Sequence, residues 1–208
     1  MNSTELLIAF VGVQILATLS PGPAFLVVSR SALQGGRMAG LAAAMACTLG
    51  FFIWLVATMA GIELILSRFV WLHEAVRVAG GVFLIYLAVQ QWRHAHEPLP
   101  EVRAGETLQE GIASYFATAL LLQLGNPKAL AYCVSVLVVL VPPQSPLWVK
   151  VAVPVIGALI EAVWWTVLAF AFSHGSFRQG YGRLKGAIDR VIGVALGGLG
   201  IRLLAEKT

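Results

Sequence analysis

Charged residues are scarce in this chain of 208 residues. They make up 12% of it, against 59% for hydrophobic residues, whereas a soluble domain contains about 25% charged residues. The mean hydropathy is +0.84. Hydrophobic segments and short connections account for the whole sequence, which leaves no room for a soluble domain beside them. The composition therefore predicts a membrane protein.

Cysteine is rare, and familiar catalytic motifs are missing. Cys47 and Cys133 both lie in apolar runs, where cysteine usually behaves as a small hydrophobe, so no disulfide is predicted. The four histidines lack the spacing of metal ligands. There is no P-loop, GxSxG or HExxH motif, and no GxGxxG in a strand–helix context. We expect neither an ATPase nor a hydrolase, and no enzyme of another kind, no cofactor and no metal site.

Basic residues outnumber acidic ones, but they do not form a nucleic-acid site. The net charge is +4 and the pI about 9.4, without a basic patch interleaved with aromatics. We expect a lipid bilayer as partner and no nucleic acid. Residues 1–5 contain no Lys or Arg, so the first hydrophobic segment is expected to be retained and not to be a cleaved signal peptide.

Six hydrophobic runs organise the chain, three on each side of a polar stretch. They cover 6–29, 38–62, 78–92, 111–141, 147–172 and 191–204. We predict an all-α polytopic membrane protein whose six transmembrane helices form a 3+3 inverted repeat. The first repeat is 1–92, the polar linker 93–110 and the second repeat 111–208, within a single membrane domain. An odd number of helices in each half makes the halves insert in opposite orientations, and the third helix of each half is expected to be short.

Two proline-containing breaks, 20–23 and 125–128, interrupt the first and fourth runs. Pro23 and Pro127 are 104 residues apart. Proline removes a backbone donor and disturbs the helix, and irregular backbone inside a bilayer is tolerated where it lines a cavity. Matching breaks in two halves point to a transporter's binding site, and restarting helix ends favour anions such as a carboxylate. The residues expected to bind substrate are Ser20, Pro21, Gly22, Pro23, Gln14, Gln123, Asn126, Pro127 and Lys128. The alternative is that both breaks are kinks that only shape the bundle.

Two charges lie inside hydrophobic runs. Burying Lys128 costs about 3 kcal/mol on insertion scales, so we expect it to contact a substrate carboxylate or to relay protons, unless it reaches the membrane surface. Glu161 follows ten uncharged residues and precedes eleven. We expect Glu161 to couple proton movement to transport or to neutralise a substrate ammonium. The alternative is a structural ion pair of Glu161 with Lys128 or Arg77.

Other residues in the runs are expected to have packing roles. Thr18 and Tyr132 are predicted to make interhelical hydrogen bonds of about 0.6 kcal/mol each, and Trp165 is expected to pack. Gly193 and Gly197 have the spacing of a close helix contact. This contact is either internal or the seam of a homodimer.

The distribution of Lys and Arg predicts the orientation of the chain. The first, third and fifth loops contain eight basic residues, and the second and fourth loops with the termini contain five. Because basic loops stay in the cytoplasm, both termini are predicted to face outward.

The breaks and their surroundings resemble the LysE/RhtB family of amino-acid exporters, the homoserine, threonine and lysine efflux type. The resemblance rests on the residues 20–23, followed by Arg30, Gly35, Arg37 and Gly40, on Gly80 with 83–87, and on 125–129. It implies secondary efflux of amino acids or close derivatives such as homoserine or its lactone from a bacterial cytoplasm. We predict an exporter in the inner membrane that is driven by the proton-motive force. The chain has Ala24 where the family often has Asn, and Glu161 where it often has Asp, which leaves the substrate open.

Two other functions remain open. A membrane thiol–disulfide carrier would need a redox cysteine pair beside the breaks, and neither cysteine is adjacent to the proline of its half. A non-transporting assembly subunit would tolerate substitution of Lys128 and Glu161.

Overall fold

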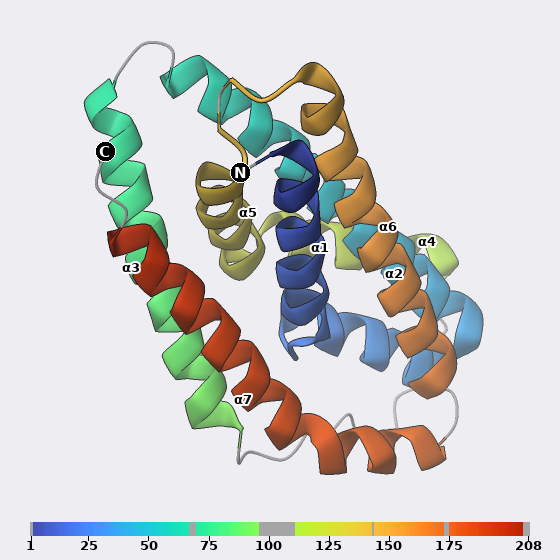
Figure 1. The fold of residues 1–208 in the computed structure, drawn as a ribbon. Coiled ribbons are helices and arrows are strands. Elements are labelled where there is room, and N and C mark those ends of the chain that lie inside the picture. Colours follow the sequence, from blue (N-terminus) through green and yellow to red (C-terminus); the bar gives the residue numbers. More distant parts are fainter. Residues whose placement is uncertain (1, 67–69, 96–110, 143, 173–174, 206–208) are drawn as a thin grey trace.

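The computed structural model describes residues 2–66, 70–95, 111–142, 144–172 and 175–205. All regular structure in these ranges is α-helical (Figure 1), which confirms the all-α prediction there. The helices are α1 (Ser3–Leu19), α2 (Pro23–Leu66), α3 (Val70–His94), α4 (Ile112–Leu124), α5 (Pro127–Leu140), α6 (Leu147–Phe172) and α7 (Gly175–Ala205).

The first predicted break separates α1 from α2. Helix α1 begins with a capping box, in which the Asn2 side chain accepts from Glu5 N at 2.8 Å and the Glu5 carboxylate accepts from Asn2 N at 3.0 Å. Helix α1 ends at Leu19, and Ser20 has extended backbone angles (φ −70°, ψ 125°). The helix restarts at Pro23, so the chain is unwound over three residues.

Helix α2 folds back on itself at Gly36, between the first two predicted hydrophobic runs. The backbone there has φ 74°, which glycine adopts without steric cost. A Cβ placed on Gly40 would lie 2.7 Å from that of Ala32, so the two arms of the turn are in close contact. Helix α2 therefore consists of two segments, 23–35 and 37–66.

The second predicted break separates α4 from α5 at Gly125 and Asn126. The two helices bend by 52° across it. The Asn126 side chain accepts from the backbone N–H of Lys128 at 3.0 Å and caps α5. Pro127 is the first residue of α5, where a missing N–H costs nothing because that donor would be unpaired in any helix.

The length and hydropathy of the helices identify fewer spans than the six predicted. Within the described residues, 23–61 and 147–172 are long and apolar enough to cross a membrane, and the bent pair α4–α5 is a third candidate if its two helices are taken as one span. Helix α1 is apolar but only 17 residues long. This identification uses only the length and composition of the described helices, so the six-span repeat remains a prediction.

The short third and sixth helices were predicted wrongly. Helix α3 has 25 residues and α7 has 31, because the charged stretches before their apolar runs continue as helix instead of forming loops. Lys185 and Arg190, two of the eight basic residues that the orientation prediction counted in loops, therefore lie within α7. Helix α3 also extends to His94, into the expected linker, and residues 96–110 of that linker lie outside the described residues.

Two helix pairs pack antiparallel through small residues. In the α2–α6 pair, a Cβ on Gly40 would lie 3.1 Å from Ala169 and one on Gly157 would lie 2.6 Å from Leu55. Figure 1 shows the second pair, α3 and α7, side by side, and α3 also packs against α5, where a Cβ on Gly80 would lie 3.2 Å from Ser135 Cα.

Glycines make the α3–α7 contact a backbone contact. A Cβ on Gly200 would lie 2.8 Å from the carbonyl oxygen of Gly81, and one on Gly193 would lie 3.1 Å from that of Ala88. Gly197 faces Ala88 as well. The internal alternative for Gly193 and Gly197 is thus the one seen, and a dimer seam there stays an untested prediction.

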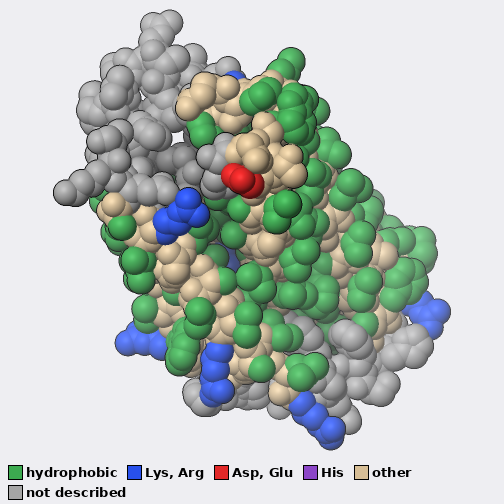
Figure 2. All heavy atoms as spheres, viewed as in Figure 1, with side chains coloured by type: hydrophobic (Ala, Val, Ile, Leu, Met, Phe, Trp, Pro, Cys, Tyr) green, Lys and Arg blue, Asp and Glu red, His purple; other side chains and the backbone are tan. Residues whose placement is uncertain are grey.

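The outer surface of the bundle is largely apolar. Leu121 and Leu147 are 71% and 77% exposed, and many other Leu, Ile and Val side chains are also uncovered. Figure 2 shows these hydrophobic side chains over most of the visible face, with Lys and Arg mainly toward its lower edge. An apolar exterior of this extent suits contact with lipid and would be a liability in water.

Candidate functional site

The two breaks meet α1 and α6 around a small cavity of about 50 Å³. This space accepts a few water molecules but no amino acid. Its walls include residues from both breaks, from α1 and from α6. The polar residues among them are Gln14, Thr18, Ser20, Gln123, Asn126, Lys128, Tyr132 and Glu161.

Glu161 is the acidic residue of this small cavity and is only 4% exposed. Its Oε1 accepts from Thr18 Oγ1 at 2.9 Å and from Gln14 Nε2 at 3.3 Å. Its Oε2 accepts from the indole N–H of Trp165. Three donors thus surround the carboxyl group, two of them from α1, and they offset part of the cost of burying it.

A second set of hydrogen bonds ties α1 to α5. Gln14 is fully buried, and its Oε1 accepts from the Tyr132 hydroxyl at 3.0 Å. Thr18 Oγ1 lies 2.8 Å from the Gln14 carbonyl oxygen and 3.0 Å from the Gln14 side-chain nitrogen. Glu161 is therefore connected through α1 to the helix that carries Lys128.

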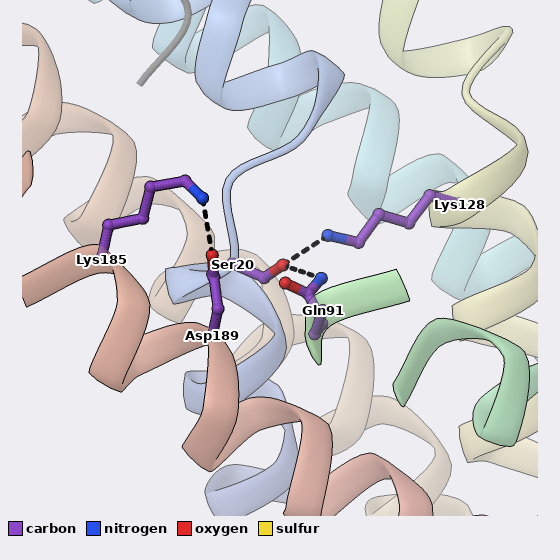
Figure 3. Close-up of polar contacts among 5 residues, drawn as sticks. All are labelled: Ser20, Gln91, Lys128, Lys185 and Asp189. Atoms are coloured by element: carbon purple, nitrogen blue, oxygen red, sulfur yellow. Dashed lines mark hydrogen bonds and ion pairs between the residues drawn. The ribbon is translucent and has the colours of Figure 1, made fainter. Parts of the chain in front are cut away.

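Lys128 lies between the two breaks. Its Nζ donates to Ser20 Oγ at 2.8 Å, and the Gln91 side-chain amide donates to the same oxygen, as Figure 3 shows. Lys128 forms no ion pair with Glu161 within the described part of the chain, so the predicted alternative of a structural pair between them is not realised. An ammonium group has three donors, and the contacts described here use one of them.

A larger cavity of about 510 Å³ lies on the other side of this contact, toward α3 and α7. Gly22, Pro23 and Lys128 line both cavities. The larger one is also lined by Pro21, Leu26, Phe83, Tyr86, Leu87, Gln90, Gln91, Pro127, Lys185 and Asp189. The Ser20–Lys128 contact therefore stands at the boundary between a nearly filled space and an open one.

Every residue predicted for the site lies on one of the two cavities. The small cavity contains Gln14, Ser20, Gly22, Pro23, Gln123, Asn126, Lys128 and Glu161. Pro21 and Pro127 line the larger one. Lys128 N–H, however, is already bonded to the Asn126 side chain, so this donor of the α5 terminus is not open for an anion as the sequence suggested.

Sequence reasoning underestimated several residues of the site. Thr18 and Tyr132 were expected only to bridge helices, and Trp165 only to pack, yet all three line the cavity. Gln91 and Asp189 were missed. Gln91 ends an apolar run and Asp189 lies in a basic stretch, and only the spacing of Asp189 four residues after Lys185 offered a signal.

The two cysteines do not form a redox pair. Cys47 and Cys133 are free and buried, and they belong to separate hydrophobic clusters. Neither lines the cavities described above.

The apolar exterior and the two broken helices around a polar cavity are features of a polytopic helical membrane transporter. Residues 15–207 match the family model of LysE type translocators, and the chain belongs to this family. It is 30% identical over 201 residues to the threonine efflux protein of Escherichia coli strain K12, covering 94% of this chain and 95% of that protein.

Other relatives have similar lengths. The threonine efflux protein of Salmonella typhi is 31% identical over 198 residues, with 94% and 95% of the two chains covered. The uncharacterized membrane protein YahN of Escherichia coli strain K12 is 26% identical over 200 residues, with 94% and 87% covered. No solved structure matches the chain.

Proposed function

We propose that this protein is a secondary transporter that exports amino acids or close derivatives from the bacterial cytoplasm across the inner membrane, driven by the proton-motive force. The observation that carries the proposal is that Lys128 and Glu161 line one cavity, where both helix breaks meet, without pairing with each other. Charged groups inside a membrane protein are costly and usually functional. The similarity to threonine efflux proteins supports an amino-acid substrate.

Lys128 is the proposed partner of the substrate carboxylate. Its one described acceptor, Ser20 Oγ, is an uncharged hydroxyl, which a carboxylate can replace with a stronger, charge-assisted hydrogen bond. Ser20 and Gln91, released from this contact, would then be available as further polar partners.

Glu161 is the proposed proton carrier, and the geometry around Thr18 suits this role. A threonine hydroxyl has one proton to donate, and two acceptors lie within reach: Glu161 Oε1 at 2.9 Å and the Gln14 carbonyl oxygen at 2.8 Å. When Glu161 is ionised, Thr18 donates to it. When Glu161 is protonated, it donates to Thr18, and Thr18 turns to the Gln14 carbonyl. Both protonation states are therefore hydrogen-bonded.

We also propose the 3+3 inverted repeat, with 1–92 and 111–208 as its halves. Each helical segment has a counterpart when α1 is equated with α4, 23–35 with α5, 37–66 with α6 and α3 with α7. The counterparts 37–66 and α6, and likewise α3 and α7, pack antiparallel, which supports halves of opposite orientation. Helices that are related by a pseudo-two-fold axis in the membrane plane cross the membrane in opposite directions. We also propose that both termini face outward, because the first, third and fifth loops predicted from the sequence hold more Lys and Arg than the other loops. Lys185, one of the residues counted there, is buried in α7 and does not contribute to this argument.

The test uses proteoliposomes to distinguish proton-driven accumulation of the substrate from simple exchange of substrate across the membrane. Wild-type protein should accumulate labelled L-threonine, or another amino acid from a panel, against its gradient when a proton gradient is imposed. Glu161→Gln should abolish accumulation but retain exchange of labelled for unlabelled substrate, because exchange needs no net proton movement. Glu161→Asp, which keeps an ionisable group, is the matched control. Absence of transport for every amino acid in the panel would overturn the proposed function.

Substitution of both charges distinguishes a transporter from an assembly subunit. A protein that only supports assembly would behave alike with Lys128→Gln, Glu161→Gln or the native residues. No transport by the purified wild-type protein, together with cells that behave alike with either variant or the native protein, would therefore favour that alternative.

A further inference from the structure

The larger cavity contains a buried carboxylate that the proposed mechanism does not use. Asp189 of α7 is 1% exposed and lines this cavity. Its Oδ2 accepts from Lys185 Nζ at 2.8 Å. Its Oδ1 is buried and has no hydrogen-bond partner among the described residues. A buried acceptor left without a donor costs about 1–3 kcal/mol, and more when it is charged.

The cavity around Asp189 suits a small zwitterion. Its volume of about 510 Å³ is ten times that of the space beside Glu161. Lys128 lines it from α5 and Asp189 from α7, so the walls carry charges of both signs. The amide side chains of Gln90 and Gln91 and the apolar side chains of Phe83 and Leu87 complete the wall contributed by α3. A few placed polar groups in an apolar cavity are typical of small-molecule sites.

The Lys185 contact holds Asp189 in place. Lys185 is 5% exposed and lies one helical turn before Asp189. Lys185 holds Oδ2, so Oδ1 is the oxygen of Asp189 that lacks a donor among the described residues. Figure 3 shows this pair near the unwound segment at Ser20, with Lys128 and Gln91 on the other side of that residue.

We propose that the cavity between α3, α5, α7 and the first break is an amino-acid site, in which Asp189 Oδ1 accepts a hydrogen bond from the substrate ammonium group. The inference rests on the proposed function, because it takes the substrate to be an amino acid whose carboxylate is bound by Lys128. In this conformation the substrate occupies the larger cavity, because the small one has no room for it. The Ser20–Lys128 contact then separates this site from Glu161.

The competing explanation is that Lys185 and Asp189 form a purely structural ion pair. Such a pair can often be replaced by neutral residues without loss of stability, whereas removing one partner is destabilising. The test must therefore distinguish a change in ligand recognition from a change in folding.

The experiment measures ligand binding by the full-length protein purified in detergent. The ligands are the twenty standard L-amino acids and L-homoserine, followed by the 2-hydroxy acid analogue of the tightest binder, in which a hydroxyl replaces the ammonium. The wild type should bind the amino acid roughly 10- to 100-fold more tightly than the hydroxy acid, the range expected for one charge-assisted hydrogen bond. Asp189→Asn should remove this preference by weakening only the amino acid.

The double variant Lys185→Gln with Asp189→Asn controls for structure. It replaces the ion pair with a neutral amide pair, so it should recover stability but not the preference for the ammonium. Equal weakening of both ligands by Asp189→Asn, a recovered preference in the double variant, or no binding by any panel compound would each overturn the inference.

Lys128→Gln separates this inference from the proposed carboxylate site. Both ligands have a carboxylate, so this variant should weaken both alike. If Lys128→Gln has no effect while Asp189→Asn removes the preference, Asp189 recognises the ammonium but the proposed role of Lys128 is wrong.

Discussion

The two breaks lie in corresponding positions of the two halves, yet they differ in how their polar groups are used. The second is closed by its own cap, since Asn126 accepts from Lys128 N, and Asn126 Nδ2 in turn lies 3.3 Å from Gln123 Oε1. The first is unwound over Ser20, Pro21 and Gly22, and the Ser20 hydroxyl receives its partners from α3 and α5. One break is thus internally braced, whereas the other depends on contacts with distant helices.

This difference suggests that the two breaks have different roles in transport. The braced second break fixes the start of α5 and so positions Lys128. The first break supplies the hydroxyl that Lys128 must release when it binds a carboxylate. A short capped turn moves less readily than an unwound segment held by side chains of other elements, so we expect the first break to rearrange during transport.

The largest effect should come from Lys128, the residue that joins the two breaks. Lys128→Gln should lower the transport rate by roughly 10- to 100-fold, because a hydrogen bond to a charged group contributes about 1.5–3 kcal/mol. Lys128→Arg keeps the charge and should retain part of the activity. Initial rates of uptake into proteoliposomes measure both, and a Gln variant as active as the wild type would contradict the comparison.

A smaller effect is expected from the first break itself. A Cβ on Gly22 would lie 3.3 Å from Lys128 Nζ and 3.6 Å from its Cδ. Gly22→Ala should therefore displace the ammonium and lower transport by roughly tenfold, since small displacements of a binding group are costly. The matched control is Gly12→Ala, whose Cβ would meet nothing within 4 Å. Equal activity of the two variants would show that Lys128 adapts to the change.

The smallest effect should come from the cap of the second break. Asn126→Ala removes the acceptor for Lys128 N and should lower the free energy of unfolding by about 1 kcal/mol. Asn126→Asp, another good N-cap residue, should retain most of the stability. Thermal unfolding in detergent measures the difference. If Asn126→Ala leaves stability unchanged but Gly22→Ala lowers it, the first break is the braced one.

The sequence was sufficient to find the breaks and the two intramembrane charges. Proline interrupts a hydrophobic run visibly, and a lone Lys128 or Glu161 stands out because burying a charge is expensive. The turn at Gly36 was also predictable, because the adjacent residues Gly35 and Gly36 lie between two long hydrophobic runs. These signals are local, so they need no knowledge of which helices meet.

The partners of these residues could not be predicted in the same way. Trp165 and Gln91 are ordinary in composition, and they became site residues only because α6 and α3 bring them to the cavities. Asp189 was hidden because a basic stretch with an acidic residue usually indicates a solvated helix face. Its burial depends on the packing of α7 against α3, and the glycines that allow this packing were its only signal in the sequence.

The close approach of Gly81 and Gly200 has a consequence for how the molecule can change shape. Where two backbones are in contact, neither helix can rotate or slide without a steric clash. We therefore expect α3 and α7 to move together as one rigid body. Gln91 and Asp189 belong to this helix pair, whereas Glu161 belongs to α6, outside it. A rotation of this helix pair relative to the other helices would then widen one of the two cavities as it narrows the other, with the unwound residues 20–22 as the hinge.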